Sequence, residues 1–252
     1  MTPQQQPDSS GDSEDATITA RIKCAVKTCG EEFETAACVI GERTYYQSRE
    51  CPACQAKATE IAAAAAAEKQ KEERQKRFNK LAGEYYTSAA IRDAMPKDKV
   101  REIRTLLKMN KGVMAVGLSG AFKTTCMLSG VRWLIEEKGC EVTMMTGAEF
   151  GQRLTAAAKA CNIESFLRPL KKVPWLFIDD LGHRITETVG EALHDLIEAR
   201  VKHCRPMLVT TQFGSADFCA QFDRPETGLA VARRIRLLCE KVEFSPPNPE
   251  HP

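Results

Sequence analysis

Four short apolar runs in the second half of the chain constrain its fold more than any other feature. They are GVMAV (112–116), EVTMM (141–145), PWLFI (174–178) and PMLVT (206–210). Runs of this kind, without polar alternation, are typical of strands that are buried on both faces. Helical patterns lie between them, such as TETVGEALHDLIEARVKHC (186–204), in which Val189, Leu193 and Leu196 recur on one face. The alternation predicts an α/β fold with a parallel sheet covered by helices on both sides.

A glycine-rich segment follows directly after the first apolar run. It reads GLSGAFKTT (117–125) and matches the phosphate-loop pattern G-x-x-x-x-G-K-[ST], except that Phe122 replaces the glycine before the lysine. Lys123 is expected to neutralise charge on the β- and γ-phosphates of ATP, and Thr124 to offer its hydroxyl to Mg²⁺. The alternative is a chance match. A phenylalanine is tolerable here if its backbone angles are ordinary and its ring points away from the phosphates.

The nucleotide contacts expected from this match are Gly117, Ser119, Gly120, Ala121, Phe122, Lys123, Thr124 and Thr125. Two further candidates, Asp179 and Asp180, end the apolar run WLFI, and Asp179 follows Thr124 by 55 positions. In P-loop ATPases the first acid holds Mg²⁺ through water, and the second is the general base for the attacking water. Aspartate is one methylene shorter than the commoner glutamate, so slower hydrolysis is expected. The alternative is a pair of aspartates that caps the next turn.

Four of the 11 cysteines form two close pairs near the N-terminus. Cys24 and Cys29 are separated by four residues, Cys51 and Cys54 by two, and 21 residues lie between the pairs. This spacing is that of a zinc ribbon, in which four thiolates around Zn²⁺ stabilise a module too small for its own core. Cys38 is a spare or a replacement ligand, and a redox pair or simple buried cysteines are the alternatives. The flanks are not strongly basic, which favours a protein partner over DNA.

The segment after the cysteines is rich in alanine and charge and contains no glycine or proline before Gly83. Glu72 with Lys76 and Glu73 with Arg77 stand at the i,i+4 spacing that supports a helix. Because an apolar stripe is lacking, a solvated helical spacer is expected rather than a coiled coil. An excess of lysine and arginine leaves contact with a nucleic-acid backbone as the alternative.

Composition sets the remaining limits. The chain has 252 residues, is 43% hydrophobic and carries a formal net charge of +2, which by itself does not argue for nucleic acid. The polar, acidic N-terminus resembles a disordered tail and not a signal peptide, and no apolar run is long enough to span a membrane. The other cysteines are scattered singly, so we expect a reduced, cytoplasmic protein. The expected parts are a disordered acidic tail (1–20), a zinc module (21–56), a helical connector (57–95), an ATPase core (96–244) and a flexible tail (245–252).

The chain resembles the DnaC/IstB family of AAA+ ATPases, which comprises helicase loaders and transposition ATP-binding proteins. The resemblance is carried by GLSGAFKTT, WLFIDDLG, EALHDLIEARVKHCRPMLVTTQF and VARRIRLLCEKVEF, over roughly residues 112–244. It implies an AAA+ core without a C-terminal lid. It also implies that Gln212 is the sensor-1 residue, usually asparagine, and that Arg234 is the arginine finger, with Arg233 as the alternative.

The same resemblance implies a function. A DnaC-like loader would be switched by ATP, form homo-oligomers through its ATP interface, and work with single-stranded DNA and a DnaB-type replicative helicase. The alternatives are an IstB-like transposition or phage replication accessory ATPase, and a non-hydrolysing zinc-ribbon adaptor with a degenerate P-loop. A zinc-ribbon transcription factor is a weaker alternative, because the ATPase core argues against it.

Overall fold

A computed structural model of the chain describes residues 17–40, 42–87 and 95–245. The chain divides into two compact units, Met1–Gln70 and Lys71–Pro252. Among the described residues, no helix is both long enough and apolar enough to cross a membrane. Most of the acidic tail and of the proline-rich tail expected from the sequence lies outside the described residues.

The first unit is built on a three-stranded antiparallel sheet of order β1-β2-β3. Its strands are β1 (Thr17–Lys23), β2 (Glu32–Ile40) and β3 (Arg43–Tyr46). Residues 17–20, expected in the disordered tail, instead begin β1, where Ile18 pairs with Ala37 and Ala20 with Thr35. The correction has a simple cause, because apolar residues alternate along this stretch and share one face of the sheet.

Helix α1 (Pro52–Thr87) begins in the first unit and ends in the second. Its exposed residues before Lys71 fit the solvated spacer expected from the sequence, but Phe78 and Ala82 are buried in the core of the second unit. Arg77 pairs with Glu141 rather than with Glu73. The expectation of a wholly solvated connector is therefore wrong for the second half of the helix. Two apolar positions one turn apart are enough to attach a helix to a core.

The second unit contains a five-stranded sheet in which all strands are parallel, with the order β5-β6-β7-β4-β8. Its strands are β4 (Gly112–Gly117), β5 (Val142–Thr146), β6 (Trp175–Asp179), β7 (Met207–Thr211) and β8 (Cys239–Phe244). Its helices are the second half of α1, α3 (Lys97–Lys108), α4 (Lys123–Glu136), α5 (Gly147–Lys159), α6 (Ile163–Lys172), α7 (Glu187–Lys202), α8 (Ser215–Ala220) and α9 (Pro225–Leu238). The four apolar runs of the sequence are thus strands, each within one residue of its expected bounds.

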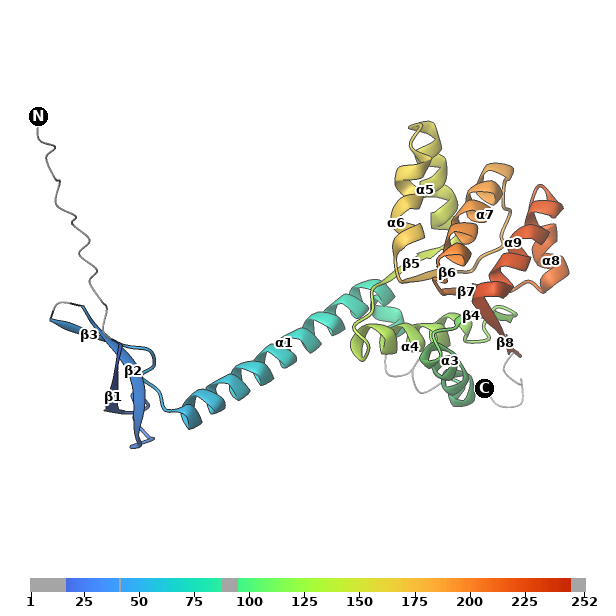
Figure 1. Cartoon of the computed structure of the whole chain (residues 1–252). Helices are drawn as coiled ribbons and strands as arrows, with labels where there is room; N and C mark the ends of the chain where they lie inside the picture. Colours follow the sequence, from blue (N-terminus) through green and yellow to red (C-terminus); the bar gives the residue numbers. More distant parts are fainter. Residues whose placement is uncertain (1–16, 41, 88–94, 246–252) are drawn as a thin grey trace, which may run out of the picture. The chain divides into compact units, whose positions relative to one another are not determined.

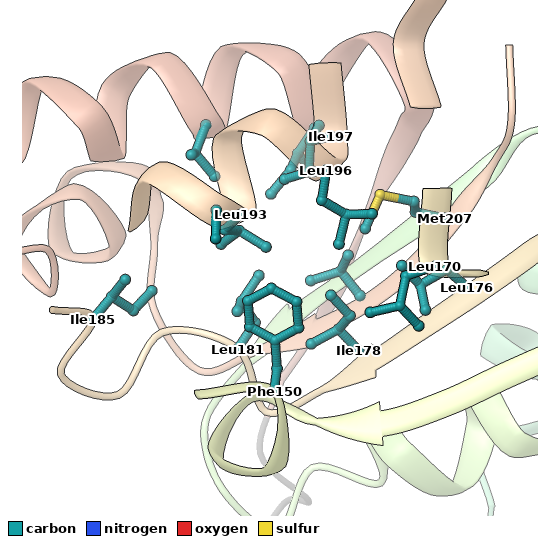
Figure 2. Close-up of a cluster of buried hydrophobic side chains, with 14 of the residues drawn as sticks. Phe150, Leu170, Leu176, Ile178, Leu181, Ile185, Leu193, Leu196, Ile197 and Met207 are labelled. Atoms are coloured by element: carbon teal, nitrogen blue, oxygen red, sulfur yellow. The ribbon is translucent and has the colours of Figure 1, made fainter. Parts of the chain in front are cut away.

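Helices cover both faces of this sheet and bury two separate cores. Along β6, Leu176 and Ile178 face the core under α5, α6, α7 and α9, whereas Phe177 faces the core under α3 and α4. Figure 1 shows these two groups of helices on opposite sides of the strands, and Figure 2 shows the first core, with Phe150 among the leucines and isoleucines. Successive side chains of a strand point to opposite faces, so an unbroken apolar run is what a doubly covered sheet requires.

Candidate functional site

Three strand ends meet at one edge of the five-stranded sheet. The glycine-rich loop follows β4, Asp179 ends β6, and Gln212 follows β7. Because β7 lies between β6 and β4, the carboxyl ends of all three strands are neighbours. This is the edge at which parallel α/β sheets bind their ligands.

A cavity of about 360 Å³ lies at this edge. It brings together most of the nucleotide contacts expected from the sequence. Its lining consists of Tyr86, Ser119, Gly120, Ala121, Phe122, Lys123, Thr124, Thr125, Asp179, Asp180, Thr210 and Gln212. Gly117 lies at the base of the loop and is not part of the lining.

Glycine is needed at two positions of the loop for different reasons. A Cβ built on Gly117 would lie 2.2 Å from the carbonyl oxygen of Phe244 in the adjacent strand β8, so any side chain there would collide with backbone. Gly120 adopts a φ of 80° with open space around it, so its requirement is conformational rather than steric. The loop therefore depends on close strand packing at its start and on a left-handed residue in its middle.

Phe122 also adopts a left-handed conformation, with φ 59° and ψ 16°, directly before the first residue of α4. The sequence-based condition that its backbone angles be ordinary is therefore not met. The loop must reverse direction here to aim the first N–H groups of α4 at the cavity, and glycine is the usual residue for such a turn. The side chain is half-buried against the core beneath α3 and α4 and also lines the cavity.

At the base of the cavity, burial and neighbouring charges shift the pKa of Lys123 in opposite directions. Lys123 is largely buried, and its Nζ donates a hydrogen bond to the Leu118 carbonyl at 2.7 Å. Burial lowers the pKa of Lys123, whereas the negative charges of Asp180 and Asp179 raise it. Burial likewise raises the pKa of Asp179. A bound polyphosphate and its cation would compensate both buried charges.

Asp179 is held by two hydroxyl groups. Thr124 Oγ1 donates to Asp179 Oδ1 at 2.8 Å, and Thr210 Oγ1 donates to the same oxygen at 2.6 Å. A hydroxyl and a carboxylate are the hard oxygen ligands that Mg²⁺ prefers, so this pair fits a magnesium site. Thr210 was not singled out from the sequence, although a polar residue near the end of a buried strand is a usable signal.

Asp180 comes next and adopts a φ of 52°. Its backbone N–H donates to Thr210 Oγ1 at 2.7 Å, and its Oδ1 lies 3.4 Å from Gln212 Nε2. His183 Nε2 lies 3.3 Å from the other carboxylate oxygen of Asp180, and His183 was likewise missed by the sequence reasoning. Its position three residues after the acid pair was the available signal.

Arg234 lies outside the cavity. It is on α9, where its Nε pairs with Glu198 Oε2 of α7. The adjacent Arg233 is exposed and has no ion pair with any described residue. The structure thus separates both arginines from the nucleotide cavity of their own chain.

The four cysteines of the two close pairs come together in the first unit. The sulfur atoms of Cys24, Cys29, Cys51 and Cys54 all lie within 4.8 Å of one another, and those of Cys29 and Cys51 are 3.6 Å apart. A tetrahedral Zn²⁺ with Zn–S bonds of about 2.3 Å requires sulfurs about 3.8 Å apart, so the donor set fits zinc. The Cys51 N–H donates to Cys24 Sγ at 3.3 Å and lowers the pKa of that thiol to about 7.

Cys38 is not part of this group of sulfurs. It lies on β2, opposite Tyr45 of β3, and its sulfur is not among those that converge. Of the two interpretations left open by the sequence, a spare cysteine therefore fits the structure, and a replacement ligand does not.

Of the comparisons with known proteins, the one with solved structures agrees with this architecture. No model of a known protein family matches the chain, and no curated protein matches it either. Among solved structures, the DnaC helicase loader is 21% identical with a TM-score of 0.56, over 64% of this chain and 99% of that one. DnaI is 17% identical with a TM-score of 0.52, over 60% of this chain and 95% of that one.

A protein from Streptococcus pyogenes serotype M3 described as a primosome component is 21% identical, with a TM-score of 0.50, over 60% of this chain and 80% of that one. At these identities the likeness concerns the fold. It fits the resemblance drawn from the sequence motifs, and the cysteine group precedes the matching architecture. The second unit of the chain has the fold of the DnaC helicase loader, with a parallel sheet covered by helices on both faces.

Proposed function

We propose that the protein binds and hydrolyses ATP and acts in DNA replication as a DnaC-like helicase loader. The observation that carries the ATPase part is the convergence of Lys123, Thr124, Asp179, Asp180 and Gln212 on one cavity at the edge of the sheet. Neighbouring amide groups of the loop and the N-terminus of α4 would bind the phosphates. A chance match of glycines and a lysine would not bring a downstream acid pair into the same cavity.

Each polar side chain of the cavity has a role in this proposal. Lys123 would neutralise the β- and γ-phosphates, and Thr124 and Asp179 would hold Mg²⁺, which supplies further charge compensation when bound. Asp180 would take a proton from the attacking water, whose oxygen bonds to the γ-phosphorus as the bond to the bridging oxygen of ADP breaks. Gln212, which follows β7, would orient Asp180. The products are ADP and inorganic phosphate.

The loader role rests on the family resemblance and on the DnaC helicase loader among the neighbours in fold. We assign a DnaB-type helicase and single-stranded DNA as partners on that basis, with the zinc module and α1 as the part that binds the helicase. ATP between two copies of the chain would hold a homo-oligomer together. Arg234 would reach the γ-phosphate of a neighbouring copy after leaving Glu198, and the exposed Arg233 is the alternative.

A non-hydrolysing adaptor is the second candidate function, and one observation favours it. Phe122 holds a left-handed conformation and lines the cavity where glycine would leave more room. In that case the phosphate loop would be structural and the protein would act through its zinc module alone.

The experiment that separates the two candidates measures ATP binding and hydrolysis by the purified full chain, with Mg²⁺ and with or without single-stranded DNA. Lys123→Ala should abolish hydrolysis, because it removes the charge that faces the phosphates. Lys108→Ala, an exposed lysine in the last turn of α3, is the matched control and should behave as wild type. A change of rate on adding DNA supports the loader. Wild type that binds no ATP, with binding restored by Phe122→Gly, would favour the adaptor and overturn the ATPase proposal.

A further inference from the structure

The Asp180 carboxylate is contacted from two sides by side chains that come from different loops. Gln212, after β7, approaches one carboxylate oxygen, and His183, on the loop between β6 and α7, approaches the other. We propose that His183 is a positioning residue that holds Asp180 in the orientation needed for ATP hydrolysis. This inference rests on the ATPase function proposed above and adds a residue to it.

The backbone of Asp180 is fixed, but its side chain depends on these contacts. The residue follows β6 directly, and its N–H donates to Thr210 Oγ1 at 2.7 Å, which sets the position of its Cα. The side chain is 52% exposed, so packing does not select its rotamer. Its polar side-chain contacts among the described residues are His183 at 3.3 Å and Gln212 at 3.4 Å. The orientation of the carboxylate therefore depends on these two neighbours.

His183 acts from outside the nucleotide cavity. It is absent from the cavity lining, and it lines instead a groove of about 800 Å³ between α5 and the loop after β6. Asp180 lines both the cavity and the groove, whereas Gln212 lines the cavity. His183 thus does not line the site expected for the phosphates, and any effect it has on hydrolysis passes through the two cavity side chains that it contacts, Asp180 and Gln212.

Two neighbouring side chains, Phe213 and Gln212, contact the His183 imidazole. Its ring packs edge-on against Phe213, with centroids 5.2 Å apart and planes at 72°. Its Nε2 also lies 2.6 Å from Gln212 Nε2, a distance that requires one donor and one acceptor. An Nε2–H directed at Asp180 requires that the Gln212 amide be turned over, so that its oxygen faces the imidazole. In that tautomer His183, and not Gln212, is the side chain that donates to the Asp180 carboxylate.

Because the side chain of Asp180 is short, the rate of hydrolysis is more sensitive to the orientation of its carboxylate. Aspartate reaches one methylene less far than glutamate, so a rotation of its carboxylate away from the phosphates cannot be corrected by extending the chain. Small errors in the placement of a reacting group lower the rate of the chemical step more than they weaken ground-state binding. We therefore expect His183 to influence kcat and not KM.

The test is steady-state hydrolysis of Mg-ATP by the full chain. His183→Ala should lower kcat about tenfold and leave KM within about twofold of wild type. His183→Gln places an amide nitrogen at a reach similar to that of Nε2 and should restore kcat to within about threefold of wild type. His203→Ala, an exposed histidine at the end of α7, is the matched control and should leave both constants unchanged.

The outcomes separate this inference from the proposed function. Wild type that neither binds nor hydrolyses ATP overturns the ATPase and this inference with it. Wild type that hydrolyses ATP, with His183→Ala equal to it in kcat, overturns the inference alone. A raised KM at unchanged kcat assigns His183 to binding and also overturns it. The same holds if His183→Gln is as slow as His183→Ala and both melt at lower temperature, because that result indicates a structural role.

Discussion

At position 122, a phenylalanine holds the left-handed conformation for which glycine is the ordinary residue. A residue with a Cβ pays about 1–2 kcal/mol in this region of φ and ψ, and glycine does not. The conformation is held by two hydrogen bonds: Lys123 Nζ donates to the Leu118 carbonyl at 2.7 Å, and the Cys126 N–H donates to the Phe122 carbonyl at 2.9 Å. Backbone strain of this kind is concentrated at ligand-binding loops.

The strain at Phe122 can be measured with two substitutions that remove the same ring. Phe122→Gly should be about 1 kcal/mol more stable than Phe122→Ala, because both lose the ring but only glycine relieves the left-handed backbone. Chemical denaturation of the nucleotide-free protein measures the difference.

The control for this comparison is Ala156→Gly, one turn before the C-cap of α5, where the backbone is helical. There the sign should reverse, with glycine about 0.5–1 kcal/mol less stable than alanine. Equal stabilities of Phe122→Gly and Phe122→Ala would show that the φ of 59° carries no cost.

Among the helices, α7 depends on a buried arginine near its C-terminal end. Arg200 is fully buried, and its guanidinium donates to the carbonyl oxygens of Leu170, Val173, Pro174 and Pro206, at 2.6–3.1 Å. Burial lowers its pKa to about 10. The bonds join the end of α6 and the approaches to β6 and β7 to one side chain. The negative end of the α6 dipole helps to compensate its charge.

Removing this guanidinium should destabilise the second unit strongly. Arg200→Met is expected to lower the free energy of unfolding by about 3 kcal/mol or more, because four carbonyl groups lose their donor. Arg200→Lys should also cost about 2 kcal/mol, since an ammonium cannot span all four acceptors. Urea denaturation measures both variants.

An exposed arginine of the neighbouring helix provides the control. Arg168→Met on α6 should change stability by no more than about 0.5 kcal/mol. If Arg200→Met were as stable as Arg168→Met, the four bonds would contribute nothing beyond the packing of the side chain.

The elements that the sequence predicted well are those with a strong local signal. The four apolar runs are typical of strands covered on both faces, and the loop and the acid pair were recognisable because strands precede them. Arg200 was missed because residue type places arginine on the surface, although its spacing from Leu193 and Leu196 puts it on the buried face of α7. The contacts of His183 with Gln212 and Phe213, and the burial of Phe78, join segments that are distant in the sequence, so the local pattern gives only a weak signal for them.

At the scale of the whole molecule, the two units differ in what stabilises each of them. The second unit has two extensive apolar cores, whereas the buried residues described in the first are Cys24, Thr35, Ala37 and Cys51. A core of that size cannot stabilise an independent module, so another source of stability is needed. Four converging sulfurs offer a metal ion as that source.

Removal of metal should therefore unfold the first unit and spare the second. The full chain is expected to bind about one Zn²⁺, and Cys54→Ser should reduce this content, because it removes one of four ligands. Cys38→Ser is the matched control and should retain the metal, since its sulfur lies outside the group.

A chelator should abolish the circular-dichroism signal of the small sheet. The chelator should not alter the melting temperature of the second unit, or the increase in that temperature on ATP binding, because the core of this unit contains none of these cysteines. Loss of zinc from Cys38→Ser, or a chelator-treated protein with its small sheet intact, would contradict a structural zinc site of these four cysteines.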